Sequence, residues 1–190
     1  MAFPRVTEIA HLILRSRITQ GDHVVDATVG NGHDTIFLAE CVGTTGRVDG
    51  FDIQKEAIES TLSRIGPGSP QVLLHHSGHE NLATIVRPGV TAVMFNLGYF
   101  PSGDKSIITR AETTIAALQA SISLLREGGV ISILLYPGHE GGNCEATAVE
   151  AWVNELDEHR FASIHYGPKG NSRSPFLLAI EKRNRVRSET

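Results

Sequence analysis

Two short apolar segments each end in an aspartate, and a turn with two glycines follows the first of them. Asp26 follows Val24-Val25 and precedes the turn Gly30-Asn31-Gly32, and Asp52 ends the next apolar segment. Glycines allow a positive φ and a close approach of a ligand to the backbone. An acidic side chain about twenty residues later can accept hydrogen bonds from ribose hydroxyls. Because a carboxylate at Asp26 favours a nearby cation and disfavours a pyrophosphate, the pattern predicts S-adenosylmethionine (SAM) as the ligand.

Two common nucleotide-binding patterns do not fit this turn. The dinucleotide pattern G-x-G-x-x-G needs a third glycine where this chain has Thr35, and the P-loop pattern needs a following G-K-[ST], which is absent. An NAD-linked enzyme is an alternative, but the absence of the third glycine argues against it. The other alternative is a tight strand-to-helix turn that carries a surface aspartate and binds nothing.

Two later segments are polar and glycine-rich where a simple connection would be shorter. Residues 96–105 begin at the end of a predicted strand, 91–96, and residues 136–142 begin at the end of another, 130–136. The carboxyl ends of parallel strands meet at one edge of an α/β sheet, so both segments are expected to face the turn at Gly30. In a methyl transfer the protein mainly positions the acceptor and excludes water.

These two segments supply the candidate catalytic residues. Asn96 can hold the target group, and Tyr99 can stack on a base. An amine acceptor must lose a proton, and His139 is the best candidate base because the unperturbed pKa of histidine lies near neutrality. The alternatives are that Tyr99 only covers the edge of the core and that His139 is an exposed turn residue.

A cluster of histidines follows the predicted third strand, 71–75. The spacing of His75, His76 and His79 matches no metal-binding motif, so no metal site is predicted. Residues 77–81 follow this strand, where SAM-dependent enzymes commonly hold the adenine, and His79 and Glu80 are the predicted contacts.

Composition limits the partners. The chain has 190 residues, of which 41% are hydrophobic and 20% charged, and is expected to form one domain over 1–190. The net charge of −4 gives no overall attraction to nucleic acid, so an RNA substrate needs a local basic patch. Lys105, Lys169 and Arg173 are the candidate phosphate contacts. No signal peptide or membrane span is recognised, and two distant cysteines, Cys41 and Cys144, fit a reducing cytoplasm.

Apolar periodicity predicts strands that alternate with helices, which indicates an α/β sheet with helices on both faces. The last two strands have no helix between them, so one of them must run antiparallel. Thr7 is expected to cap the first helix, and Asp34 or Thr35 the second. The predicted helices are 7–19, 34–42, 56–65, 81–85, 109–125 and 145–158, and the predicted strands are 24–29, 47–53, 71–75, 91–96, 130–136, 161–166 and 175–182.

Three motifs together resemble those of a family of small bacterial proteins long described as rRNA methylases. The first is Asp26-Ala-Thr-Val-Gly-Asn-Gly-His-Asp-Thr35, and the second is Asn96-Leu-Gly-Tyr-Phe-Pro-Ser-Gly-Asp-Lys105. The third is Tyr136-Pro-Gly-His139 with Gly141-Gly142 and Glu145. With the closing region around Asn171 and Pro175, the resemblance extends over nearly the whole chain. Phe100 replaces the leucine expected in the second motif.

The resemblance implies a class I SAM-dependent methyltransferase with a seven-stranded, mostly parallel, Rossmann-like sheet and an antiparallel closing strand. Members of this family are implicated in N-methylation of 5-aminomethyl-(2-thio)uridine at the wobble position of tRNA, which gives the 5-methylaminomethyl form. The anticodon stem-loop is then the expected partner. Apart from the resemblance, a homodimer is expected because the domain is compact and has no obvious RNA-binding extension. An rRNA or small-molecule methyltransferase and a non-catalytic SAM- or RNA-binding module are the alternatives.

The resemblance also implies roles for individual residues. The common amino-methyltransferase run Asn-Pro-Pro-Tyr is here Asn-Leu-Gly-Tyr, so the acceptor contacts rest on fewer matched positions than the cofactor contacts. Asn96, Tyr99 and His139 would flank the methyl acceptor, and Asn96 would also contact SAM. The residues implied around the cofactor are Asp26, Gly30, Asn31, Gly32, Asp34 and Thr35 for the methionine part, and Asp52 and Gln54 for the ribose and adenine.

Overall fold

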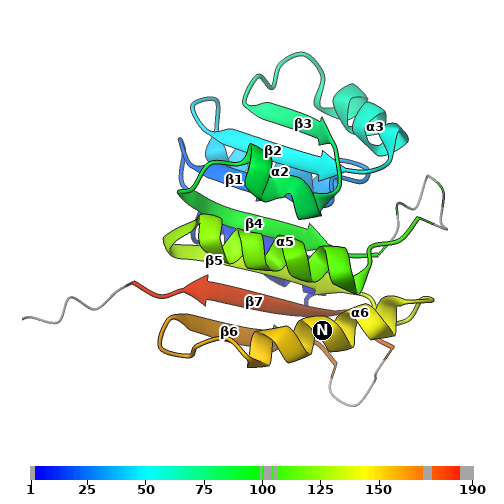
Figure 1. Cartoon of the computed structure of the whole chain (residues 1–190). Helices are drawn as coiled ribbons and strands as arrows, with labels where there is room; N and C mark the ends of the chain where they lie inside the picture. The colour runs from blue at the N-terminus through cyan, green and yellow to red at the C-terminus, as the bar shows by residue number, and fades with distance from the viewer. Residues whose placement is uncertain (1–2, 99, 101–103, 105–106, 169–172, 185–190) are drawn as a thin grey trace, which may run out of the picture.

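Seven strands form a single sheet in the order β3-β2-β1-β4-β5-β7-β6 (Figure 1). The structure is a computed structural model, and it describes residues 3–98, 100, 104, 107–168 and 173–184. Strands β1 to β5 are parallel, and β7 pairs antiparallel with both β5 and β6. The strands are β1 (His23–Asp26), β2 (Arg47–Asp52), β3 (Val72–His76), β4 (Val90–Asn96), β5 (Leu125–Leu135), β6 (Phe161–Tyr166) and β7 (Phe176–Lys182).

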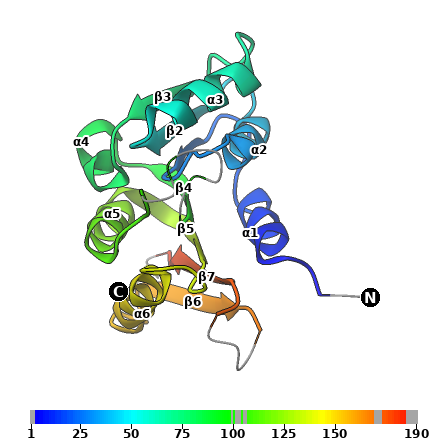
Figure 2. The ribbon, with the colours of Figure 1, turned by 90° about the vertical axis from the view of Figure 1, so that its right-hand side faces the viewer.

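Helices cover both faces of the sheet. Figure 2 shows α1 (Val6–Arg15) and α2 (His33–Val42) on one side, with α5 (Ala111–Leu124) and α6 (Gly142–Asn154) on the other. The remaining helices are α3 (Lys55–Ile65), the 3₁₀ turn η1 (His79–Asn81) and α4 (Leu82–Ile85). No helix within the described ranges is long and apolar enough to cross a membrane.

Each face of the sheet has its own apolar core, because successive strand residues point to opposite faces. On β4, Phe95 packs into the core shared with α5 and α6, whereas the adjacent Met94 packs into the core shared with α1 and α2. Both side chains are fully buried. This fold is the predicted α/β sheet with an antiparallel closing strand, and that prediction is confirmed.

Several helices begin at other residues than the predicted ones. Helix α1 begins at Val6 rather than after Thr7, and the Arg5 amide donates to Glu8 at 2.9 Å. Helix α2 begins directly after Gly32, so neither Asp34 nor Thr35 caps it. Helix α5 begins at Ala111 rather than at residue 109. The predicted caps were therefore wrong. Two helices were also predicted too far along the chain, since the predicted 7–19 is α1, Val6–Arg15, and the predicted 145–158 is α6, Gly142–Asn154.

Gly32 is required by both its backbone angle and its surroundings. Its φ is +78°, and a Cβ added there would lie 2.6 Å from Oγ1 of Thr61. Gly66 also has a positive φ, +62°, but a Cβ there would meet nothing within 4 Å. Gly66 therefore lacks the crowding found at Gly32, but its ψ of −175° places it in a backbone region that is essentially restricted to glycine, unlike the left-handed helical angles of Gly32.

We expect Gly32→Ala to lower the free energy of unfolding by about 3 kcal/mol, because it combines left-handed strain with overpacking. Gly66→Ala meets no crowding but places alanine in a sparsely populated backbone region, at a cost of about 1–3 kcal/mol, so it does not isolate the crowding at Gly32. Adding Thr61→Ala to Gly32→Ala should recover part of the loss, which urea unfolding measures against wild type and Thr61→Ala alone. No recovery would show that the contact with Thr61 does not matter.

Candidate functional site

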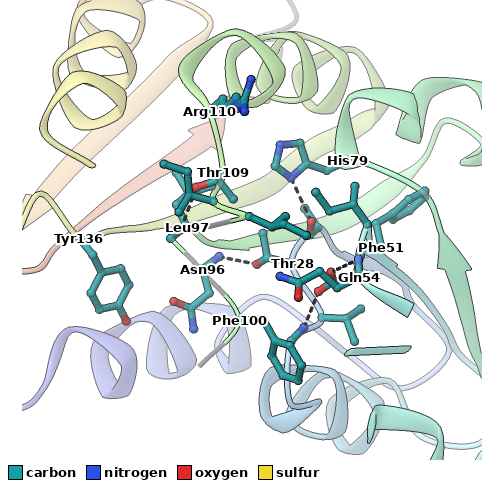
Figure 3. A pocket seen from close by; sticks show the side chains of 18 of the residues that line it. Thr28, Phe51, Gln54, His79, Asn96, Leu97, Phe100, Thr109, Arg110 and Tyr136 are labelled. Carbon is teal, nitrogen blue, oxygen red and sulfur yellow. Dashed lines mark hydrogen bonds between the residues drawn. The ribbon is translucent and has the colours of Figure 1, made fainter. Parts of the chain in front are cut away.

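A cavity of about 1020 Å³ opens at the carboxyl ends of the parallel strands. Figure 3 shows its lining, to which the segments after β1, β2, β3, β4 and β5 all contribute. This is the edge at which ligands bind in open α/β sheets. The predicted site residues that line it are Gly30, Asn31, Asp34, Asp52, Gln54, His79, Glu80, Asn96, His139 and Arg173. Tyr99, Lys105 and Lys169 lie outside the described residues.

Three predicted cofactor contacts lie beneath the cavity rather than in its lining: Asp26, Gly32 and Thr35. Asp26 is completely buried, and its carboxylate accepts hydrogen bonds from the Thr28 amide at 3.1 Å and the Thr35 hydroxyl at 2.6 Å. These bonds tie the end of β1 to the first turn of α2. The structure therefore gives Asp26 and Thr35 a part in shaping the turn, and it places neither side chain where a ligand would touch it.

Burial raises the pKa of Asp26 from 3.8 to about 7, and the nearby Asp34 carboxylate adds to the increase. Between about pH 4 and pH 7 the folded protein holds a proton that the unfolded chain has released. The Asp26 contribution to the free energy of unfolding therefore falls as the pH rises through this range.

We expect Asp26→Asn to remove this contribution, since an amide cannot titrate. Urea unfolding of wild type and variant at intervals from about pH 5 to about pH 7.5 gives the comparison. Relative to wild type, the variant should gain stability with rising pH, by a few kcal/mol at most. Parallel pH curves for the two proteins would show that Asp26 ionises normally in the fold.

Asp52 links two turns of the cavity wall. Its Oδ2 accepts from the Gly30 amide at 2.9 Å, and its Oδ1 accepts from the Gln54 amide at 2.9 Å. Burial raises the pKa of Asp52, and these two amide hydrogen bonds oppose the increase. Because each carboxylate oxygen can accept a second hydrogen bond, Asp52 can hold the turns and two ligand hydroxyls together.

Asp34 joins three elements at the next part of the wall. The ring of His11, on α1, donates from Nε2 to Asp34 Oδ1 at 2.7 Å. The side-chain amide of Asn96, at the end of β4, donates from Nδ2 to Asp34 Oδ2 at 3.0 Å. The Asn96 backbone amide also donates to the Thr28 hydroxyl at 2.7 Å, a bond drawn in Figure 3. These bonds fix both the main chain and the side chain of Asn96.

The two histidines of the cavity differ in their surroundings. His79 is buried and donates from Nδ1 to the Ala27 carbonyl at 3.2 Å. Burial lowers the pKa of His79, so its ring is neutral at pH 7. His139 is more exposed and donates from Nδ1 to the Glu140 carbonyl at 2.8 Å, and its Nε2 lies beside Gly98.

A buried carboxylate that was not predicted as a site residue supports the segment after β4. Glu145, on α6, accepts from the hydroxyls of Thr109 and Thr114, each at 2.7 Å. The Thr109 hydroxyl in turn accepts from the Gly98 amide at 2.8 Å. Burial raises the pKa of Glu145, and the two hydroxyls oppose the increase. The sequence did offer a signal for this residue, because Glu145 belongs to the third motif. A glutamate that is buried in the fold needs bonding partners, and here the two threonines provide them.

Tyr136, at the end of β5, also lines the cavity, although it was not among the predicted site residues. Burial, and next the Asp34 carboxylate, raise the pKa of its hydroxyl. His11 and Arg110 were missed as well. Arg110 directly precedes α5 at the cavity wall. His11 had no signal, because only the tertiary packing of α1 brings it to Asp34.

The histidines after β3 do not gather around a metal. His75 and His23 donate to the two oxygens of the buried Asp49 at 2.7 and 2.6 Å. Burial alone would raise the pKa of Asp49, but the bonds from His23, Arg47 and His75 outweigh it and lower the pKa. Among the described residues, no group of three or more His, Cys, Asp or Glu is placed to hold a metal ion.

The chain is similar in sequence and in fold to known proteins. The chain is 39% identical to the chloroplastic "tRNA (mnm(5)s(2)U34)-methyltransferase" of Arabidopsis thaliana, over 94% of this chain and 70% of that protein. A crystal structure from Clostridium thermocellum, described as a "putative rRNA-methylase", is 40% identical with a TM-score of 0.91, covering 96% of this chain and all of the other.

A methyltransferase-like structure from Streptococcus mutans, SMU.1697c, was solved in complex with SAH. It is 33% identical with a TM-score of 0.85, covering 95% of this chain and 99% of the other. A family model also matches residues 48–181, well over half of the chain. The chain therefore belongs to the family described as "Putative rRNA methylase".

Proposed function

We propose that this protein is a SAM-dependent methyltransferase that methylates the aminomethyl nitrogen of 5-aminomethyl-(2-thio)uridine at the wobble position of tRNA. The observation that carries the proposal is the similarity, along 94% of the chain, to a relative named as a tRNA (mnm(5)s(2)U34)-methyltransferase. The cavity at the sheet edge supports it, because its polar groups match the parts of the cofactor and of an amine.

The size and donor set of the cavity fit SAM. Small-molecule sites typically occupy about 300–1,000 Å³, so a cavity of about 1020 Å³ has room for the cofactor beside a nucleoside. Asp52 has free lone pairs for the ribose hydroxyls, since its amide bonds use only one on each oxygen. His79 and Glu80 lie at the part of the wall proposed for the adenine, and Gly30, Asn31 and Asp34 at the part proposed for the methionine.

When bound, the cofactor supplies a methyl group that its sulfonium already activates for displacement. The residues of this chain then have to hold the amine in line and keep water out. Asn96 Oδ1 accepts an N–H of the amine, which leaves the nitrogen lone pair free to attack. His139, which lies in the cavity lining, is proposed to take the proton that the amine loses. Tyr99, outside the described residues, is proposed to stack on the uracil.

The RNA is proposed to enter as the anticodon stem-loop. Arg173 lines the cavity, and Arg110 lies on its wall as a second cation. Lys105 and Lys169 extend this set in the sequence. The net charge of −4 means that these few cations must provide the phosphate contacts locally. A homodimer and a cytoplasmic location are predictions from the sequence.

Two assays test the proposed function. Calorimetry should show SAM binding to the purified protein, with NAD as the negative control. SAH formation should then follow the addition of tRNA with an aminomethylated wobble uridine, and not of the same tRNA without it. Turnover only with rRNA or small amines would favour the first alternative. SAM binding without turnover on any acceptor would favour a non-catalytic module.

A further inference from the structure

His11 bonds Asp34, a residue of the cavity lining, although His11 lies outside the three motifs and outside the family match at 48–181. Its ring stacks on Phe37 with the centroids 3.9 Å apart and the planes 4° from parallel. The edge of the ring bonds Asp34 at 2.7 Å. Helix α1 is anchored beside it by Ala10 and Leu14, which are fully buried. The face of the His11 ring is therefore fixed by Phe37 and its edge by Asp34, while 32% of the side chain is still exposed.

Asp34 links His11 to Asn96 through its two carboxylate oxygens. An ionised carboxylate can only accept hydrogen bonds, and a side-chain amide has one donating and one accepting end. One oxygen of Asp34 accepts a hydrogen bond from His11, and the other accepts one from Asn96 Nδ2. Asn96 must therefore turn its nitrogen toward Asp34 and its oxygen away from it. No described residue donates to that oxygen, and Asn96 lines the cavity.

We infer that the chain of contacts from His11 through Asp34 to Asn96 sets the acceptor site to receive an N–H group. His11 is thus a positioning residue that acts through Asp34, and the presented Asn96 Oδ1 selects amines over acceptors that offer no hydrogen. The inference rests on the proposed function, because it concerns the choice of the group that is methylated.

Loss of His11 would leave one oxygen of Asp34 without its donor. The carboxylate is then free to rotate away from Asn96, so the Asn96 side chain is no longer held with Oδ1 toward the acceptor. An amine without this fixed partner leaves its line of attack, and a misplacement of about 1 Å can cost about 100-fold in rate. Asp34 also lies at the part of the wall proposed for the methionine, so affinity for SAM should fall, but by less than kcat, because Asp52 and His79 lie elsewhere on the wall.

The test uses three variants of the full-length protein. His11→Phe keeps an aromatic ring on Phe37 but removes the donor, and we expect kcat on the aminomethylated tRNA to fall about 30-fold, with the Kd for SAM rising by less than about 5-fold. His11→Gln restores an amide donor near the position of Nε2 and should recover most of the rate. His23→Phe is the matched control, since it removes a histidine–aspartate bond of 2.6 Å outside the cavity lining. It should lower thermal stability without changing kcat.

A second readout does not depend on turnover. In ¹⁵N-labelled protein, the Asn96 side-chain NH₂ signals should show slow hydrogen exchange in wild type and His11→Gln, and fast exchange in His11→Phe. Unchanged kcat and exchange in His11→Phe would overturn the inference. A loss that His11→Gln does not restore, or that appears only in the Kd for SAM, would overturn it as well. An inactive wild type would instead refute the proposed function, and the exchange measurement would still decide the role of His11.

Discussion

Asp52→Asn is expected to weaken SAM binding by about 100-fold, which calorimetry would measure directly. The carboxylate accepts one backbone amide on each oxygen, from Gly30 and Gln54. An asparagine would turn its NH₂ group toward one of these N–H groups, and two donors cannot bond each other. The variant would also lose an ionised acceptor for the ribose. Hydrogen bonds to charged groups contribute about 1.5–3 kcal/mol each, so the loss of one or two accounts for an effect of this size.

A matched control exists on the surface of the protein. Asp157 is exposed, and its Oδ1 accepts from the amide two residues later, His159, at 2.9 Å, as Asp52 does from Gln54. Asp157→Asn should therefore leave SAM affinity unchanged. If Asp52→Asn binds SAM as tightly as Asp157→Asn does, then Asp52 has no part in the cofactor site. Thermal unfolding of both variants shows whether either one has lost its fold.

Asn96→Ala is expected to lower kcat by about 100- to 1,000-fold, which is the usual cost of removing one fixed polar group at a reacting centre. The alanine can neither accept from the amine nor bond Asp34, so the acceptor is no longer held in line. We expect the Kd for SAM to change by less than about 3-fold, since the cofactor keeps Asp52 and the glycine turn.

Single-turnover rates and calorimetry on the same protein separate the two effects. Asn154→Ala, at the end of α6 and outside the cavity lining, serves as the control and should match wild type in both. Equal losses in rate and in SAM affinity would show that Asn96 contacts the cofactor rather than the methyl acceptor. Both contacts were predicted for this residue, and this comparison decides between them.

The sequence predicted the positions of the loops better than the directions of their side chains. Strand-end polar residues and glycine turns have local signals, so the convergence of Gly30, Asp52, Asn96 and His139 on one cavity followed from the order of strands and helices. The direction of Asp26 did not follow, because a carboxylate beside a turn can face either the ligand or the backbone. Its full burial and its bonds to Thr28 and Thr35 became visible only in the folded chain.

The supporting contacts had the weakest signals, because they join residues far apart in the chain. His11 meets Asp34 across 23 positions, and Thr109 meets Glu145 across 36. Neither spacing belongs to a local pattern, and both contacts depend on how a helix packs on the sheet. The helix starts were misplaced for a related reason. Thr109 uses its hydroxyl to bond Glu145 and Gly98 rather than to begin α5, and Gly32 rather than a polar side chain precedes α2.

Nucleoside mass spectrometry is the most direct measurement of the proposed reaction. Purified protein and SAM are incubated with tRNA from a strain that lacks this methylation, and the digested nucleosides are compared with those of an untreated sample. We predict that 5-aminomethyl-(2-thio)uridine gains one methyl group on its amine and becomes the 5-methylaminomethyl form, with the other nucleosides unchanged. Protein that binds SAM but leaves this nucleoside unmodified would contradict the proposed reaction.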